Sequence, residues 1–84
     1  MNVAILLQCE DWEGLYINDK LVKEGHTLNE GTNRIKYFVK LAEVHNFDLN
    51  TLQIGYLNPE NEEWINDIGS FPEDIRDFNS GYIF

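Results

Sequence analysis

The side chains that most often carry out catalysis are scarce in this sequence. Cys9 is its one cysteine, and His26 and His45 are its only histidines. A cysteine nucleophile needs a histidine base and a group that orients it, and no local signature around Cys9 supplies them. Cys9 is therefore predicted to be a small buried thiol. We predict that the protein is not an enzyme; the alternative is a small enzyme that uses His26 with Asp11 or Glu24.

Metal, cofactor and phosphate sites are not indicated either. Neither histidine has a cysteine or carboxylate at a standard ligand spacing. The acidic run over residues 60–67 lacks the glycine and the alternating ligands of a calcium-binding EF-hand loop. Gly25 and Gly31 are six residues apart, but the lysine and hydroxyl residue that a phosphate loop needs do not follow them. The sequence therefore predicts no metal and no cofactor.

Carboxylates are the abundant chemical groups, and they are unevenly placed. The chain has 15 acidic residues against 6 lysines and arginines, a net charge of −9. Arg76 is the only basic residue in the second half, residues 46–84, which carries eight acidic residues and hence a net −7. This balance disfavours direct binding of nucleic acid or of an anionic membrane, because both require cationic side chains.

The acidic second half indicates a specific function. Carboxylates at spacings like those of phosphates can occupy the basic groove of a nucleic-acid-binding protein, where complementary charge speeds encounter and an aromatic anchor adds affinity. We hypothesise an acidic, non-enzymatic interaction protein, a phage-type inhibitor that mimics DNA charge and blocks a basic host protein such as a nucleoid protein or a DNA-processing enzyme. Trp64 or Phe71 would be the anchor if exposed. The predicted contact residues are Glu60, Glu62, Glu63, Trp64, Asp67, Phe71, Glu73, Asp74 and Asp77.

The alternative is a small cytoplasmic regulatory protein, for instance of a toxin–antitoxin type, whose acidity only serves solubility. A cytoplasmic location, in the host if the source is viral, is expected because one cysteine cannot form an intrachain disulfide. The apolar run at residues 3–7 is also too short for a signal peptide or a membrane span. A homodimer stays open, since a short chain gains core by pairing.

The elements that hold these groups are predicted to form one domain, residues 1–84. The apolar run at residues 3–7 predicts a strand that is covered on both faces. A hairpin follows over residues 15–22. Its turn falls at Asn18 and Asp19, which both tolerate the left-handed conformation of a type I′ turn.

A main helix is predicted over residues 28–45. Residues 27–30 match a capping box, in which a threonine hydroxyl and a glutamate carboxylate satisfy free backbone amides. The alternative is a helix that is capped by Thr32 and begins only there. The residues predicted on the core side of this helix are Leu28, Ile35, Phe38, Val39 and Ala42. Tyr37, Leu41 and Val44 widen that side, which would allow the helix to be covered on two faces.

Residues 51–57 alternate between apolar and polar, which predicts a half-buried strand with Leu52, Ile54 and Tyr56 on its buried face. Residues 58–78 begin with a proline and several glutamates, which favour a helix start. Gly69 is predicted to stop this helix, and residues 72–74 are predicted to start another helical turn. We therefore predict an α+β fold: an antiparallel sheet of about four strands packed on one main helix, with a short helical, acidic C-terminal segment.

The segment DWEGLYINDKLVKEGH, residues 11–26, resembles small, poorly characterised bacterial and phage proteins with a DWxGLYxxxKLVxEGH-like segment near the N-terminus. Trp64, followed by the Phe71-Pro72-Glu73 step, looks similar as well. Asp19 departs from the pattern, since a turn glycine is more usual there, and so does the helix sequence. The resemblance implies a fold but carries no assigned activity. The small size and acidity also resemble phage-encoded DNA mimics, a likeness of composition without a shared motif.

Overall fold

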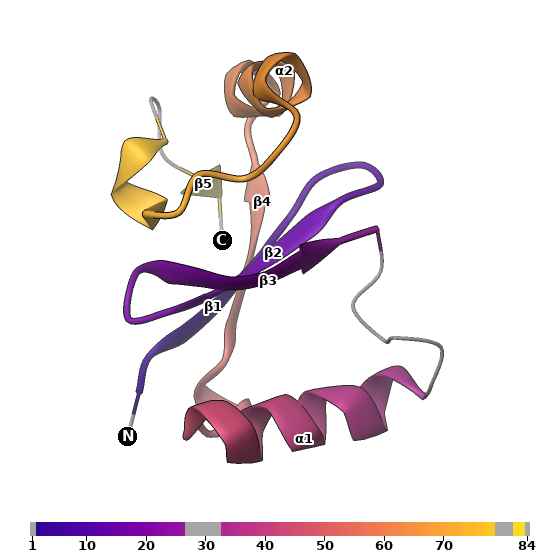
Figure 1. Cartoon of the computed structure of the whole chain (residues 1–84), viewed down its shortest axis with the longest axis vertical. Helices are drawn as coiled ribbons and strands as arrows, with labels where there is room; N and C mark the ends of the chain where they lie inside the picture. Colours follow the sequence, from indigo (N-terminus) through magenta and orange to yellow (C-terminus); the bar gives the residue numbers. More distant parts are fainter. Residues whose placement is uncertain (1, 27–32, 79–81, 84) are drawn as a thin grey trace.

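The structure, a computed structural model, describes residues 2–26 and 33–78 and the backbone of residues 82–83. Its elements are β1 (Ala4–Gln8), β2 (Glu13–Ile17), β3 (Lys20–Gly25), α1 (Arg34–His45), η1 (Leu49–Thr51), β4 (Gln53–Leu57), α2 (Pro59–Ile68), η2 (Ile75–Asp77) and β5 (Tyr82–Ile83), where η denotes a 3-10 helix. Within the described ranges, five strands form one sheet, with α1 against one face and α2 with η2 against the other (Figure 1). The fold is α+β, as predicted.

The sheet is mixed, which corrects the prediction of a purely antiparallel sheet. Its strand order is β3-β2-β1-β4-β5. β1 and β4 run parallel, whereas the other neighbouring pairs are antiparallel. A parallel pair needs a crossover connection, usually a helix, and here α1 lies between β3 and β4 in the chain. Alternation of apolar residues predicts a strand but not the direction in which it pairs, so the sequence did not reveal this.

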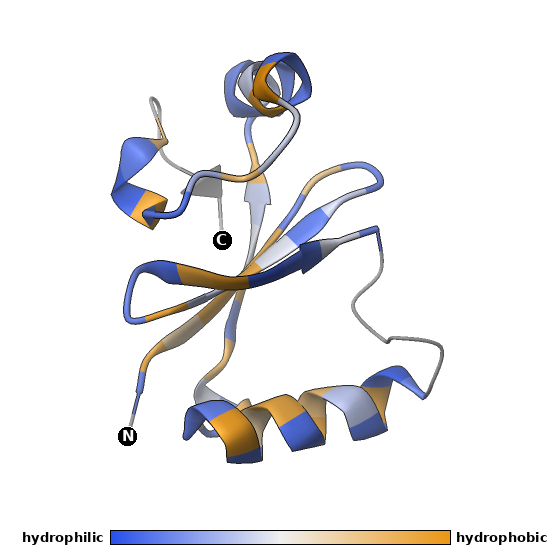
Figure 2. Ribbon diagram, viewed as in Figure 1, coloured by the Kyte–Doolittle hydropathy of each residue, from blue (hydrophilic) through white to orange (hydrophobic). Residues whose placement is uncertain are grey.

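Two helices cover the sheet instead of one, and β1 lies between two cores. Ala4 and Leu6 face the core under α1, whereas Ile5 and Leu7 face the core under α2. The α1-side core is Ala4, Leu6, Leu15, Ile17, Tyr37, Phe38, Leu41 and Phe47. The α2-side core is Ile5, Leu7, Tyr16, Leu57, Ile65, Phe71, Ile75 and Phe78. The apolar run of residues 4–7, visible as the orange stretch of β1 in Figure 2, is therefore buried on both faces as predicted, whereas Val3 at the start of the predicted strand is exposed.

The β2–β3 hairpin turns at the predicted residues. The φ angle is 49° at Asn18 and 73° at Asp19, both left-handed. The Asn18 side-chain oxygen also accepts a hydrogen bond from the backbone N–H of Val3 at 2.9 Å, which fastens the turn to β1. At the other end of β2, Gly14 makes room for Phe71, because a Cβ there would lie 2.5 Å from a ring carbon. The hairpin is thus bonded to Val3 at its turn and packs against Phe71 at the other end of β2.

α1 begins later than either predicted start. Its cap is Asn33, whose side-chain oxygen accepts from the backbone N–H of Ile35 at 2.9 Å, so the helix begins at the next residue after the cap. The capping box at residues 27–30 and Thr32 lie outside the described residues. The predicted end at His45 is confirmed.

The buried side of α1 is narrower than the predicted apolar side, which included all three buried residues of the helix. Its buried residues are Tyr37, Phe38 and Leu41. Ile35 and Val39, which were predicted to face the core, are 75% and 43% exposed. Arg34 bonds to Glu13 of β2, and the residues three, four and seven positions after it, which lie on the same side of the helix, are the buried ones. Leu28 lies outside the described residues.

β4 buries the face opposite to the one predicted. Ile54 and Tyr56 are 49% and 57% exposed, whereas Gly55 and Leu57 are buried. The reason is that α2 follows β4 and packs on the Leu57 side, where Leu57 joins the same core cluster as Ile65. The described α1-side cluster contains residues of β1 and β2 but none of β4.

α2 has the predicted start and stop chemistry. The Asn58 side chain accepts from the backbone N–H of Asn61 at 2.9 Å, Pro59 is the first helical residue, and Gly69 ends the helix with a φ of 81°. The later helical turn predicted in this segment is η2. Among the described residues, no helix combines the length and apolarity needed to cross a membrane.

Candidate partner-binding site

Three segments that are distant in sequence meet at one edge of the sheet. β1 and β4 are parallel neighbours, so the loop after β1, residues 9–12, and the helix after β4 emerge at the same edge. β3 is antiparallel to β2, which is antiparallel to β1, so His26 after β3 reaches this edge as well. The pairing of the strands therefore gathers the loop, the histidine and α2.

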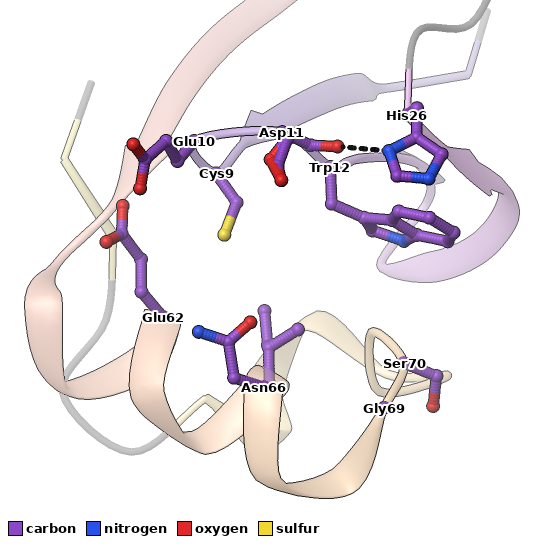
Figure 3. A pocket seen from close by; sticks show the side chains of 10 residues that line it. Cys9, Glu10, Asp11, Trp12, His26, Glu62, Asn66, Gly69 and Ser70 are labelled. Atoms are coloured by element: carbon purple, nitrogen blue, oxygen red, sulfur yellow. Dashed lines mark hydrogen bonds between the residues drawn. The ribbon is translucent and has the colours of Figure 1, made fainter.

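A cleft of about 250 Å³ lies between these segments. Residues 9–12 line one side, His26 lies at one end, and Glu62 and Asn66 of α2 line the opposite side. Figure 3 shows the carboxylates of Glu10 and Glu62 turned toward each other, with the sulfur of the cysteine between the two walls. The cleft is thus acidic at one end and aromatic at the other.

Hydrogen bonds fix the aromatic end. The indole Nε1–H of Trp12 donates to Glu24 Oε1 at 3.0 Å. His26 Nδ1 lies 2.9 Å from the Asp11 carbonyl oxygen, which can only accept, so Nδ1 carries the proton. The two rings meet edge to face with centroids 4.6 Å apart. Glu24 Oε1 also accepts from the backbone N–H of Phe71 at 3.1 Å, so one carboxylate joins the cleft wall to the segment after α2.

The chemistry of Cys9 does not favour nucleophilic catalysis. Burial raises the pKa of its thiol, and repulsion from the carboxylates of Glu62, Asp11 and Glu10 raises it further, which outweighs the lowering by a backbone hydrogen bond. The thiolate is the nucleophile, so a raised thiol pKa leaves little of it at neutral pH. Among the described residues, no group of three or more His, Cys, Asp or Glu side chains is placed to hold a metal ion.

Part of the predicted contact set forms a stripe on the outer side of α2. Glu60, Glu63 and Asp67 are exposed, and their spacing of three and four residues places them on one side of the helix. Glu62, also predicted, faces the cleft instead, together with Asn66 one turn later. α2 therefore presents carboxylates both outward and into the cleft.

The carboxylates at the C-terminal end of the predicted set differ in whether nearby cations neutralise them. Glu73 and Asp77 are exposed, whereas Asp74 accepts from Lys20 Nζ at 2.8 Å and from Arg76 Nη2 at 2.7 Å. These hydrogen bonds, first from Arg76 and then from Lys20, hold the pKa of Asp74 well below its usual range. Asp74 is therefore compensated within the protein and adds little to a negative surface.

The two aromatic candidates for an anchor are core residues to different degrees. Phe71 is 3% exposed and packs in the α2-side core, so the condition that it be exposed is not met. Trp64 is half-buried and meets Phe78 edge to face at 5.9 Å. Ile68, at the end of α2, is 48% exposed and was not predicted as a contact. The exposed apolar surface of α2 is thus Ile68 with part of Trp64.

Sequence reasoning missed the N-terminal half of the cleft. Glu10, Asp11, Trp12 and His26 lie beside α2, although more than thirty residues separate them from it in the chain. The acidic turn around Trp12 was visible in the sequence as a polar break after β1. Its proximity to α2 followed only from the parallel pairing of β1 with β4.

Comparison with known proteins adds no family. The chain matches no family model, no curated protein and no solved structure.

Proposed function

We propose that this protein is an acidic, non-enzymatic interaction protein that mimics the charge of DNA and blocks a basic nucleic-acid-binding protein, as a phage-type inhibitor would. The observation that carries the proposal is the exposed stripe of Glu60, Glu63 and Asp67 on α2. The axial rise of a helix, 1.5 Å per residue, separates neighbours in this stripe by about 4.5 and about 6 Å. Duplex DNA carries one phosphate per ~3.4 Å along each strand, so the stripe has a comparable linear charge density.

The distribution of cations supports the same proposal. Lys20 and Arg76, the cations next to the C-terminal segment, both bind Asp74. Exposed Lys36 and Lys40 belong to α1, on the opposite side of the sheet (Figure 1). The α2 side therefore keeps an excess of negative charge, which would steer a basic surface toward it. The partially exposed Trp64 and Ile68 would supply apolar contact.

The test uses displacement of DNA. A fluorescent DNA duplex bound to a purified basic nucleoid protein is titrated with this protein, and anisotropy reports release of the duplex. We expect competition that weakens when salt rises from about 50 to about 300 mM, because exposed charge pairs are screened. Failure to release DNA from any of several unrelated basic proteins at low salt would contradict the proposal.

A charge-matched pair of variants locates the surface. Glu63→Gln with Asp67→Asn removes two negative charges from α2, and Glu43→Lys on α1 changes the net charge by the same two units. We expect roughly tenfold weaker competition from the α2 variant and less than about twofold from the α1 variant. Equal losses would mean that only net charge matters, and unchanged competition in both would favour acidity that serves solubility alone.

A further inference from the structure

We propose that the cleft between residues 9–12 and α2 binds the guanidinium group of one arginine side chain on the basic partner. This inference rests on the proposed function, since it supplies a specific contact for a partner that the outer stripe of α2 would attract by charge alone. The two surfaces are neighbours, because Glu62 lines the cleft while Glu63 points outward from the same helical turn.

The size of the cleft selects a single side chain. Its volume of about 250 Å³ lies below the ~300–1,000 Å³ of pockets that hold drug-sized molecules. Ile65 and Trp12 give it apolar surface on both walls, which suits the aliphatic stem of a long side chain. A basic side chain reaching in from a partner would therefore fill it without a conformational change.

The charge of the cleft selects a cation. Glu10, Asp11 and Glu62 line it, no lysine or arginine of the described residues does, and Figure 3 shows Glu10 and Glu62 facing each other. These are the carboxylates whose repulsion, after burial, raises the pKa of the Cys9 thiol between them. A metal ion is not the expected cation, since the described residues provide no group of three ligands for one.

The shape of the cleft selects arginine over lysine. The indole of Trp12 is held by its hydrogen bond to Glu24, so it offers a fixed aromatic face rather than a mobile ring. A planar guanidinium at the acidic end can donate in two directions at once, toward Glu10 and Glu62, while the aliphatic stem behind it lies against Trp12. An ammonium is a compact point charge that lacks this planar fork of donors. The Asn66 amide offers a further acceptor on the α2 wall.

The experiment is a titration of the ¹⁵N-labelled full chain with Nα-acetyl-arginine methylamide. The protein has two tryptophans, and only Trp12 lines the cleft, so the two indole N–H signals provide a site probe and an internal control. We expect the Trp12 signal to shift and saturate with a dissociation constant on the order of 1 mM, while the Trp64 signal stays in place. The neutral isostere Nα-acetyl-citrulline methylamide should shift neither signal.

Two variants of adjacent residues sharpen the result. Glu62→Gln should weaken binding roughly tenfold, and Glu63→Gln, which makes the same change on the outer side of α2, should leave it within about twofold. Absence of a Trp12 shift, equal effects of the two variants, or an equal response to Nα-acetyl-lysine methylamide would each overturn the assignment to arginine.

The arginine titration and the DNA-displacement test can fail independently of each other. If the cleft does not bind arginine, the outer stripe of α2 can still compete with DNA, and Glu63→Gln with Asp67→Asn would still weaken that competition. If the protein displaces DNA from no basic protein, the Trp12 titration still decides whether the cleft binds a guanidinium.

Discussion

The ion pair between Glu13 and Arg34 ties α1 to β2 and allows a quantitative prediction. Arg34 Nη1 and Nη2 donate to the two carboxylate oxygens of Glu13 at 2.6 and 2.9 Å, and Gln8 Nε2 donates to the same carboxylate at 3.1 Å. The Glu13 side chain is 6% exposed and that of Arg34 is 37% exposed. The guanidinium also lies 5.0 Å from the ring centre of Phe38. Water could therefore replace Glu13 beside the partly exposed guanidinium more easily than it could replace Arg34 beside the buried carboxylate.

Removal of Arg34 should cost more than neutralisation of Glu13. Arg34→Ala takes two charge-assisted hydrogen bonds from a buried carboxylate, and breaking such a pair costs ~3–5 kcal/mol, of which we take about 3 because Gln8 remains. Glu13→Gln keeps an acceptor oxygen and leaves a guanidinium that water reaches, so about 1 kcal/mol is expected. For a domain of 84 residues, a loss of about 3 kcal/mol lowers Tm by about 15 °C.

Urea unfolding followed by tryptophan fluorescence measures both losses. The slope of the free energy of unfolding against urea should be the same in all variants, so that the midpoints can be compared directly. Lys20→Ala is the control, because its ammonium is 65% exposed in its pair with Asp74 and should cost less than the Arg34 change. A Glu13→Gln loss as large as the Arg34→Ala loss would refute the burial argument.

Two further predictions concern the walls of the cleft and the core behind it. Gly14→Ala should lower the free energy of unfolding by about 2 kcal/mol, because the added Cβ would lie 2.5 Å from the Phe71 ring; a loss below about 0.5 kcal/mol in urea unfolding would contradict this packing. Alkylation of Cys9 by iodoacetamide should reach half its maximal rate at a higher pH than for a free thiol, because its pKa is raised, and Glu62→Gln should move that midpoint to lower pH. A midpoint at or below that of free cysteine would show that the carboxylates do not act on the sulfur.

Local signals in the sequence predicted local structure well. The Asn18-Asp19 turn, the helix that starts at Pro59 and the strand buried on both faces are all present, because each depends on backbone preferences or on burial of adjacent residues. The errors concern faces rather than elements. Ile54 and Ile35 belong to a correctly predicted strand and helix but are exposed, since tertiary packing decides which side of an element is covered.

The direction of β4 was the largest omission, because it determines where the site lies. Alternating residues 53–57 would pair equally well in either direction, and the choice depends on the crossover through α1. With β4 antiparallel to β1, α2 would emerge at the opposite edge of the sheet, away from residues 9–12. The predicted contact residues would then be a stripe without a cleft.

The fold distributes the acidic residues differently from the sequence. Counted along the sequence, the second half holds the excess of acid, but Glu10 and Asp11 of the first half join that acid at the edge of the sheet. Lys36 and Lys40 lie on α1 across the sheet, so the excess of acid belongs to one face of the molecule rather than to one half of the chain. Such a separation orients the protein as well as attracting a partner. A basic surface would therefore approach the protein on the side of α2. An arginine on that surface would then reach the mouth of the cleft beside Glu62.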